Sequence, residues 1–94
     1  VIAYEPVWAI GTGITAENSQ IEEAHEVIRD FMKNVDEKIT NEVRILYGGS
    51  VKPTNAAELI AIAGVDGFLV GGASLSIDSF MEITKAISKH YDKG

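Results

Sequence analysis

The sequence has no cysteine among its 94 residues, which excludes disulfide bonds and thiolate metal sites. We therefore expect a reducing compartment and a cytoplasmic location. No apolar run has the length that a membrane-spanning helix needs, and no basic region precedes the apolar start as it does in a secretory signal. The sequence accordingly predicts no membrane partner.

Basic residues are also few, since 8 Lys and Arg stand against 14 Asp and Glu for a formal net charge of −6. They form no cluster, so the chain lacks the basic patch that nucleic acids attract. A small anionic ligand stays possible, because backbone N–H groups can hold an anion whatever the net charge. No grouping of histidines or carboxylates suggests a bound metal.

Short apolar runs alternate with stretches of helical periodicity, which predicts an α/β fold of βαβαβα order with parallel strands. Ser19 with Glu22 and Asn55 with Glu58 have the spacing of capping boxes, and Gly64 is placed to end a helix. The third strand is apolar on both faces, as a buried parallel strand should be. The expected strands are 1–4, 43–47 and 67–70, and the expected helices are 18–34, a turn within 36–42, a short helix after Asn55 and 77–90.

Glu5 stands at the end of the first strand, directly before Pro6, whose ring disfavours a helical conformation for the preceding residue. The following stretch runs from a stiff proline to the flexible Gly11-Thr12-Gly13, with an apolar tip between them. That composition suits a lid over a site. Position alone also fits a solvated loop carboxylate.

Two glycine pairs follow the second and third strands, in Gly48-Gly49-Ser50 and Gly71-Gly72-Ala73-Ser74. In a parallel β/α array the carboxyl ends of the strands share one face, where binding sites are built. Glycines there permit close approach of backbone N–H groups to an anion, although each pair alone could simply form a tight turn. The string of a nucleotide P-loop is missing.

Three stretches, 3–13, 47–50 and 67–74, resemble the triosephosphate isomerase family in content and in order. That family has the TIM (β/α)8 barrel, which needs about 250 residues, so 94 residues hold about three of its eight βα units. The resemblance therefore implies that residues 1–94 are barrel units 6 to 8, the C-terminal portion of a single TIM-barrel domain. The N-terminal part of the barrel would be a missing partner.

The resemblance also implies a role for each matching residue. Glu5 would be the catalytic base that moves a proton between neighbouring carbons of dihydroxyacetone phosphate and glyceraldehyde 3-phosphate. Tyr47 and Ser50 would hold the closed lid through the amides of Ala16 and Gly13, while Ile10 and Leu69 would flank Glu5. The phosphate would take backbone N–H groups of Gly11, Ser50, Gly71 and Gly72. The lid would include Pro6, Val7, Trp8, Ala9, Ile10, Thr12 and Gly13, with Trp8 as its anchor.

The family further implies a glycolytic isomerase that is homodimeric and uses no cofactor or metal. One position departs from the pattern, because Ile14 replaces the usual Lys, and we expect this to alter lid opening. The family's Lys, His and Asn near the site come from the first half of its barrel, so they are not recoverable here. His25 beside the first helix's apolar stripe is expected to be a partly buried packing residue, and His90 to lie in the last helical turn.

Two alternatives to catalysis remain for the chain by itself. It could bind phosphate without turning over a substrate, or it could associate with itself through open sheet edges. Without a group that polarises the substrate carbonyl, we expect little or no isomerase activity from the 94 residues alone.

Overall fold

The computed structural model describes residues 1–7 and 16–92. Strands and helices alternate in the predicted order, so the α/β class is confirmed. The strands are β1 (Ile2–Tyr4), β2 (Ile45–Tyr47) and β3 (Gly67–Phe68), and the helices are α1 (Asn18–Val35), α2 (Glu37–Thr40), α3 (Ala56–Ile60), the 3-10 helix η2 (Gly72–Leu75) and α4 (Ile77–Tyr91).

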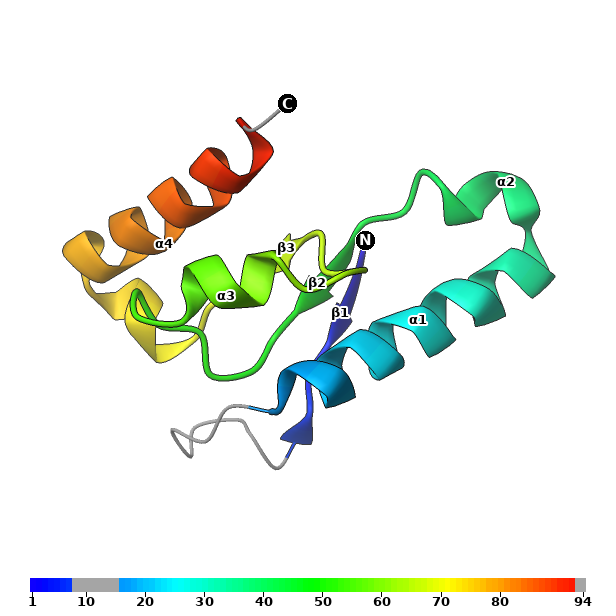
Figure 1. Cartoon of the computed structure of the whole chain (residues 1–94), viewed down its shortest axis with the longest axis horizontal. Helices are drawn as coiled ribbons and strands as arrows, with labels where there is room; N and C mark the ends of the chain where they lie inside the picture. Colours follow the sequence, from blue (N-terminus) through cyan, green and yellow to red (C-terminus); the bar gives the residue numbers. More distant parts are fainter. Residues whose placement is uncertain (8–15, 93–94) are drawn as a thin grey trace.

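The strands form one parallel sheet in the order β1-β2-β3 (Figure 1). Tyr4 pairs with Tyr47, and Tyr47 pairs with Phe68, so the three strands reach their carboxyl ends together. Strand β2 has a neighbour on both sides, whereas β1 and β3 are the edges of the described sheet, as the sequence led us to expect.

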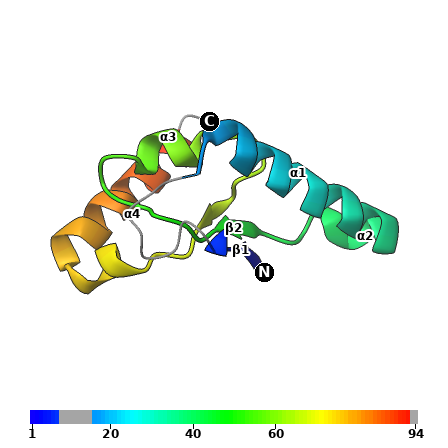
Figure 2. The same ribbon diagram turned by 90° about the horizontal axis from the view of Figure 1, so that it is seen from below.

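The helices α1 and α3 lie on one side of the sheet (Figure 2). Side chains alternate accordingly, because Ile45 and Tyr47 are fully buried under the helices while Leu46 between them is only half-buried. Ala3 pairs with Leu46 and is exposed. Neither α1 nor α3 covers the sheet face that carries Ala3 and Leu46.

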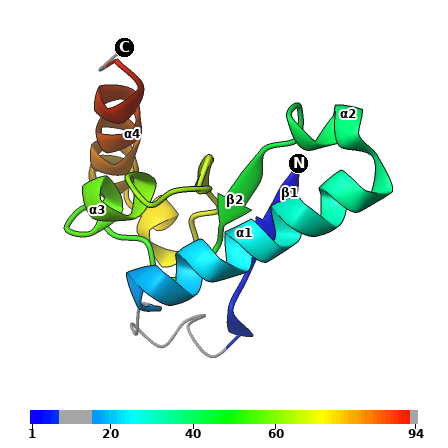
Figure 3. The same ribbon diagram turned by 45° about the vertical axis from the view of Figure 1, so that its right-hand side comes forward.

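The hydrophobic core lies between the sheet and these helices, and α3 stands between α1 and α4 (Figures 1 and 3). The fully buried side chains of this core come from β2 and from the helices α1, α3 and α4, so the helices pack against the sheet through them. The apolar stripes predicted for the helices are only partly covered, since Phe31 in α1 is 69% exposed and Ile77 in α4 is 81% exposed. The largest fully buried side chains are Tyr47, Ile21, Ile45, Leu59, Ile60, Ile83 and His25.

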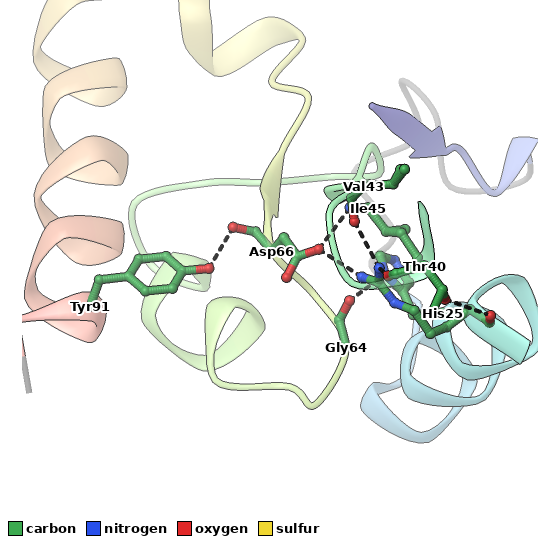
Figure 4. Close-up of polar contacts among 8 residues, drawn as sticks. His25, Thr40, Val43, Ile45, Gly64, Asp66 and Tyr91 are labelled. Carbon is green, nitrogen blue, oxygen red and sulfur yellow. Dashed lines mark hydrogen bonds and ion pairs between the residues drawn. The ribbon is translucent and has the colours of Figure 1, made fainter. Parts of the chain in front are cut away.

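Asp66, just before β3, joins several elements at the amino ends of the strands (Figure 4). One of its carboxylate oxygens accepts from Arg29 Nη2 at 2.9 Å and from the Ile45 amide at 2.8 Å. Its backbone carbonyl accepts from the Tyr91 hydroxyl at 2.7 Å. The Arg29 guanidinium also donates to the carbonyls of Thr40 and Val43. This cluster links α1, α4 and two strands.

Both predicted capping boxes are wrong. The N-cap of α1 is Glu17, two residues before Ser19, and its amide donates to Gln20 Oε1 at 3.0 Å. Glu58 accepts from Asn18 Nδ2 at 2.9 Å instead of reaching the Asn55 backbone. Asn55 is the N-cap of α3, as expected, yet its side chain makes no capping bond.

The third strand is shorter than predicted. Only Gly67 and Phe68 are in strand conformation, and Leu69 is 46% exposed. The described chain places no strand beyond β3, so the apolar run that predicted a fully buried strand lacks a neighbour on that side. The positions of the other strands, the helices and the closing Gly64, with φ of +92°, are confirmed to within a few residues.

None of the described helices combines the length and the apolar character needed to cross a membrane.

Candidate functional site

The strand register places Glu5, Gly48 and Leu69 side by side, one residue beyond the paired positions. The Gly48 amide donates to the Tyr4 carbonyl at 2.8 Å, and the Leu69 amide donates to the Tyr47 carbonyl at 3.0 Å. A Cβ atom on Gly48 would lie 2.8 Å from Glu5 Cγ and 3.3 Å from Leu69 Cβ. The Glu5 and Leu69 side chains therefore flank a position where only glycine leaves enough space.

These residues open onto a cleft of about 330 Å³ at the carboxyl ends of the strands. Its walls come from the segments that follow β1, β2 and β3, so the site exists only because the parallel strands end together. The volume lies within the range of small-molecule sites, roughly 300–1,000 Å³. The lining residues are Glu5, Gly48, Gly49, Ser50, Val51, Lys52, Leu69, Val70, Gly71, Gly72 and Ala73.

Gly71 and Gly72 form the exposed rim of the cleft where the chain turns into η2. The Gly71 carbonyl accepts from both the amide and the hydroxyl of Ser74, at 2.9 Å and 2.5 Å. Apart from the adjoining residues, no atom of the described chain lies within 4 Å of a Cβ built on either glycine. The rim thus has a defined turn, and the described residues leave the space next to both glycines open.

Tyr47 lies beneath the lining residue Gly49, with its side chain fully buried. A Cβ atom on Gly49 would lie 2.0 Å from the Tyr47 hydroxyl oxygen, so Gly49 has to be glycine for the loop to cross the ring. Burial raises the pKa of Tyr47, and an interaction with the Ala16 backbone opposes this shift. Among the described residues the hydroxyl has no partner at normal hydrogen-bond geometry. Ala16 itself is buried nearby in the core.

The structure therefore places seven of the predicted site residues at one end of the sheet, five in the cleft lining and two in the core behind it. Glu5, Ser50, Leu69, Gly71 and Gly72 line the cleft, Tyr47 and Ala16 pack behind it, Pro6 is buried and Val7 is exposed. The predictions for Trp8, Ala9, Ile10, Gly11, Thr12, Gly13 and Ile14 concern residues outside those that the structure describes.

Lys52 is a lining residue that our sequence reasoning missed. It is the one cationic residue among the described cleft residues, where it faces the same space as Glu5. Its position two residues after Ser50, in the loop at the end of β2, was the available signal, because loops at this end of a parallel sheet carry the site residues.

The two histidines lie away from the cleft. His90 is in the last turn of α4, as predicted, and its ring stacks edge-on with Tyr91 at a centroid distance of 5.1 Å. His25 is fully buried, so the prediction of partial burial is wrong. Its Nδ1 atom lies 3.1 Å from the Gly64 carbonyl, and its ring meets Tyr4 edge-on at 5.9 Å.

Burial lowers the pKa of His25, partly opposed by the bond to the Gly64 carbonyl. Since a carbonyl only accepts, Nδ1 carries the proton that it donates. Nε2 has no hydrogen-bond partner among the described residues, so a second proton would be buried unsatisfied. His25 is therefore a neutral structural residue.

Within residues 1–7 and 16–92, no three His, Asp or Glu side chains converge in a way that could hold a metal ion. What the fold and cleft define is a parallel β/α segment of an α/β barrel, with its site at the carboxyl ends of the strands.

Comparison with known proteins agrees with this class. The family model described as triosephosphate isomerase matches residues 1–87. Proteins named triosephosphate isomerase are similar: that of Pelodictyon phaeoclathratiforme is 58% identical over 89 residues, covering 94% of this chain and 36% of the relative. That of Ectopseudomonas mendocina is 55% identical over 86 residues, covering 92% and 34%. That of Francisella tularensis subsp. mediasiatica is 51% identical over 89 residues, covering 95% and 35%.

The chain belongs to the triosephosphate isomerase family. It spans about a third of the length of the curated relatives that it matches, from 34% to 36%.

Proposed function

We propose that the whole protein to which this chain belongs is an isomerase that interconverts dihydroxyacetone phosphate and glyceraldehyde 3-phosphate. Support comes from relatives named triosephosphate isomerase and from the cleft, which combines one carboxylate with glycine-rich walls. The reaction belongs to the whole protein, because the chain accounts for about a third of each relative.

Glu5 is the base in this proposal. It removes the proton from the carbon next to the substrate carbonyl, giving an enediolate, and returns that proton to the neighbouring carbon. No oxidant, cofactor or metal is needed for such a transfer. The observation that carries the assignment is that Glu5 shares one cleft with Gly71 and Gly72, so a carboxylate and the backbone of two glycines border the same space.

The substrate phosphate lies at the glycine side of the cleft. Ser50, Gly71 and Gly72 donate backbone N–H groups to it, joined by Gly11, and Lys52 supplies a positive charge from the same wall. Residues 6–16 close as a lid, with Tyr47 and Ser50 holding the closed form and Leu69 shielding one side of Glu5. In this scheme the cleft separates two tasks, proton transfer at β1 and phosphate binding at β2 and β3.

Residues 1–94 are units 6 to 8 of a single barrel, and the rest of that barrel is their partner. A second, almost wholly apolar groove of about 490 Å³ supports this, because it leads from Ile2 on the open edge of β1 along exposed Val27, Phe31 and Val35 of α1. The preceding barrel units cover this groove in our proposal. The whole protein is further proposed to be a cytoplasmic homodimer that acts in glycolysis.

A chimera tests the function. Residues 1–87 replace the matched part of the Pelodictyon phaeoclathratiforme protein, which is similar enough, at 58% identity, to provide the remaining barrel. We expect the purified chimera to form glyceraldehyde 3-phosphate from dihydroxyacetone phosphate, measured in a dehydrogenase-coupled assay. The Glu5→Gln variant of the chimera should lose about 10²–10⁴-fold in kcat while still folding.

Two results would contradict the proposal. A folded chimera that shows no turnover would remove the assigned activity, and an active chimera whose Glu5→Gln variant turns over normally would remove the assigned base. Exchange of Glu82 for Gln, on the exposed face of α4, is the matched control, because it makes the same chemical change away from the cleft.

A further inference from the structure

Asn55 bridges the two sides of the loop that follows β2. Its side-chain Nδ2 donates to the Ser50 carbonyl at 2.9 Å, and its Oδ1 accepts from the Lys52 amide at 2.7 Å. These bonds use both ends of one amide group. Only a side chain that donates at one end and accepts at the other can make the pair.

The backbone bonds of the same loop fix where Asn55 stands. The Asn55 and Ala56 amides both donate to the Lys52 carbonyl, at 3.1 Å and 3.0 Å, and the Asn55 carbonyl accepts from the Leu59 amide at 3.0 Å. Asn55 is therefore anchored at the start of α3, whose Ala56, Leu59 and Ile60 are buried in the core. Through its two side-chain hydrogen bonds, Asn55 links Ser50 and Lys52 to the start of α3.

Asn55 itself does not line the cleft, whereas Ser50, Val51 and Lys52 all do. A residue that would normally cap its helix has instead turned its amide towards the cleft loop. A Gly-Gly sequence precedes the wall from Ser50 to Lys52, and the Asn55 side chain ties this glycine-flanked loop to the start of α3.

We infer that Asn55 is a positioning residue that holds the Ser50–Lys52 wall in the conformation that binds the substrate phosphate. This inference rests on the proposed function and deepens it. Asn55 acts through Ser50 and Lys52 and touches neither the reacting carbons nor Glu5. Its contribution should therefore appear with ligands that carry a phosphate and vanish with those that lack one.

The test compares two substrates in the chimera. Asn55→Ala should lower kcat/KM for glyceraldehyde 3-phosphate about 5- to 30-fold, the range expected from two ordinary hydrogen bonds, and should weaken competitive inhibition by inorganic phosphate by a similar factor. Turnover of glyceraldehyde, the same triose without its phosphate, should stay within about 2-fold of the parent chimera's value. Asn18→Ala is the matched control, because Asn18 also donates its amide, at 2.9 Å to Glu58, but lies outside the cleft lining.

Two other outcomes would overturn the inference. If turnover of both substrates slows equally, or if neither turnover changes, Asn55 has no role specific to phosphate. Asn55→Ser serves as a second variant because Ser favours a helix start but cannot span both partners; it should show the same selective loss. If both variants fail to fold, the role is structural and the inference fails. An inactive parent chimera would instead refute the proposed function itself.

Discussion

Arg29 and Asp66 form an ion pair, with Arg29 Nη2 2.9 Å from Asp66 Oδ2, and this same oxygen also accepts from the Ile45 amide at 2.8 Å. A single carboxylate oxygen thus joins α1 to β2 at the start of β3. Both side chains are 30% exposed, so solvent only partly screens the pair. The cluster lies at the amino ends of the strands, where barrel residues serve stability, while the cleft lies at the other end.

Asp66→Ala should lower the free energy of unfolding of the chimera by about 2–3 kcal/mol. The substitution removes the bonds from Arg29 and Ile45 and leaves the guanidinium without its carboxylate. Urea denaturation measures the loss. Because the cleft is at the opposite end of the strands, kcat/KM at low temperature should remain within about 2-fold of the parent value.

The exposed pair of Lys85 and Glu82 provides the control for Asp66→Ala. These side chains are 3.4 Å apart and 68% and 59% exposed, so Glu82→Ala should change stability by no more than about 0.5 kcal/mol. Equal losses from the two variants would show that the Asp66 cluster has no special role.

This cluster also marks a limit of what the sequence could predict. Apolar periodicity and the glycines predicted the α/β class, the order of elements and the end of the sheet where the cleft lies. Arg29 and Asp66 are 37 positions apart, and Tyr91 is 25 positions from Asp66, so no local pattern relates them. Their pairing depends on how α1 and α4 pack against the sheet.

The predicted capping box of α3 was wrong because both side chains have other partners. Asn55 and Glu58 have the spacing of a capping box, but each forms a bond with a more distant partner, Asn55 with Ser50 and Glu58 with Asn18. The Glu58 bond is a tertiary contact over 40 positions, whereas the Asn55 bond stays within the loop before α3, five positions away. Glu5 and Leu69, which the resemblance named, line the cleft, while it contained no signal for Asn55 or Lys52, and the roles it implied stay predictions.

Gly48→Ala should impair catalysis more than stability alone explains. The new methyl group would lie 2.8 Å from Glu5 Cγ, close to the start of that side chain, so the carboxylate has to move. We expect kcat in the chimera to fall at least 10-fold with a smaller change in KM, because the base is displaced while the phosphate wall is retained.

Gly67→Ala is the control for Gly48→Ala in the neighbouring strand. Its methyl group would meet only the far end of a flexible side chain, Leu46 Cδ2, at 3.1 Å. This variant should keep kcat within about 2-fold. If Gly48→Ala also keeps its kcat, the position of Glu5 is less constrained than the contact with Gly48 indicates.

Stability should fall as the pH drops below the unfolded-state pKa of His25, for which 6.5 is the ordinary value. Burial lowers the folded-state pKa, so above 6.5 the histidine is neutral in both states and its contribution is complete. Below 6.5 the unfolded chain binds a proton that the folded protein resists, and stability is lost until the folded-state pKa is passed. Urea midpoints of the chimera between pH 7.5 and 5 measure this slope.

His25→Gln isolates the contribution of His25 to that slope. Its amide can still donate to the Gly64 carbonyl, but it does not titrate. The variant should be less stable at pH 7.5 because the packing of the ring against Tyr4 is lost, yet its midpoint should change less with pH. Parallel pH profiles for the two proteins would assign the acid sensitivity to other groups.

The 94-residue chain alone should show little or no isomerase turnover and should self-associate. Its described cleft residues include a carboxylate and one cation but no histidine, so a group that polarises the substrate carbonyl is missing from that set. Two sheet edges and the apolar groove along α1 are uncovered in the described structure. Coupled assays and light scattering after size exclusion test both parts, and an active monomer would contradict them.

Phe31→Glu should have different effects in the 94-residue chain, where this groove is uncovered, and in the chimera, where the preceding barrel units are proposed to cover it. In the 94-residue chain Phe31 is 69% exposed, so the variant should fold as well as the parent and associate less. In the chimera the preceding barrel units are proposed to cover Phe31, and a buried, unpaired carboxylate should destabilise the protein by several kcal/mol, about the cost of an uncompensated charge. Asp30→Glu is the control. Asp30 is already an exposed carboxylate on α1, so this substitution should be neutral in both proteins. Equal tolerance of Phe31→Glu in the chain and in the chimera would mean that the rest of the barrel does not pack on this face.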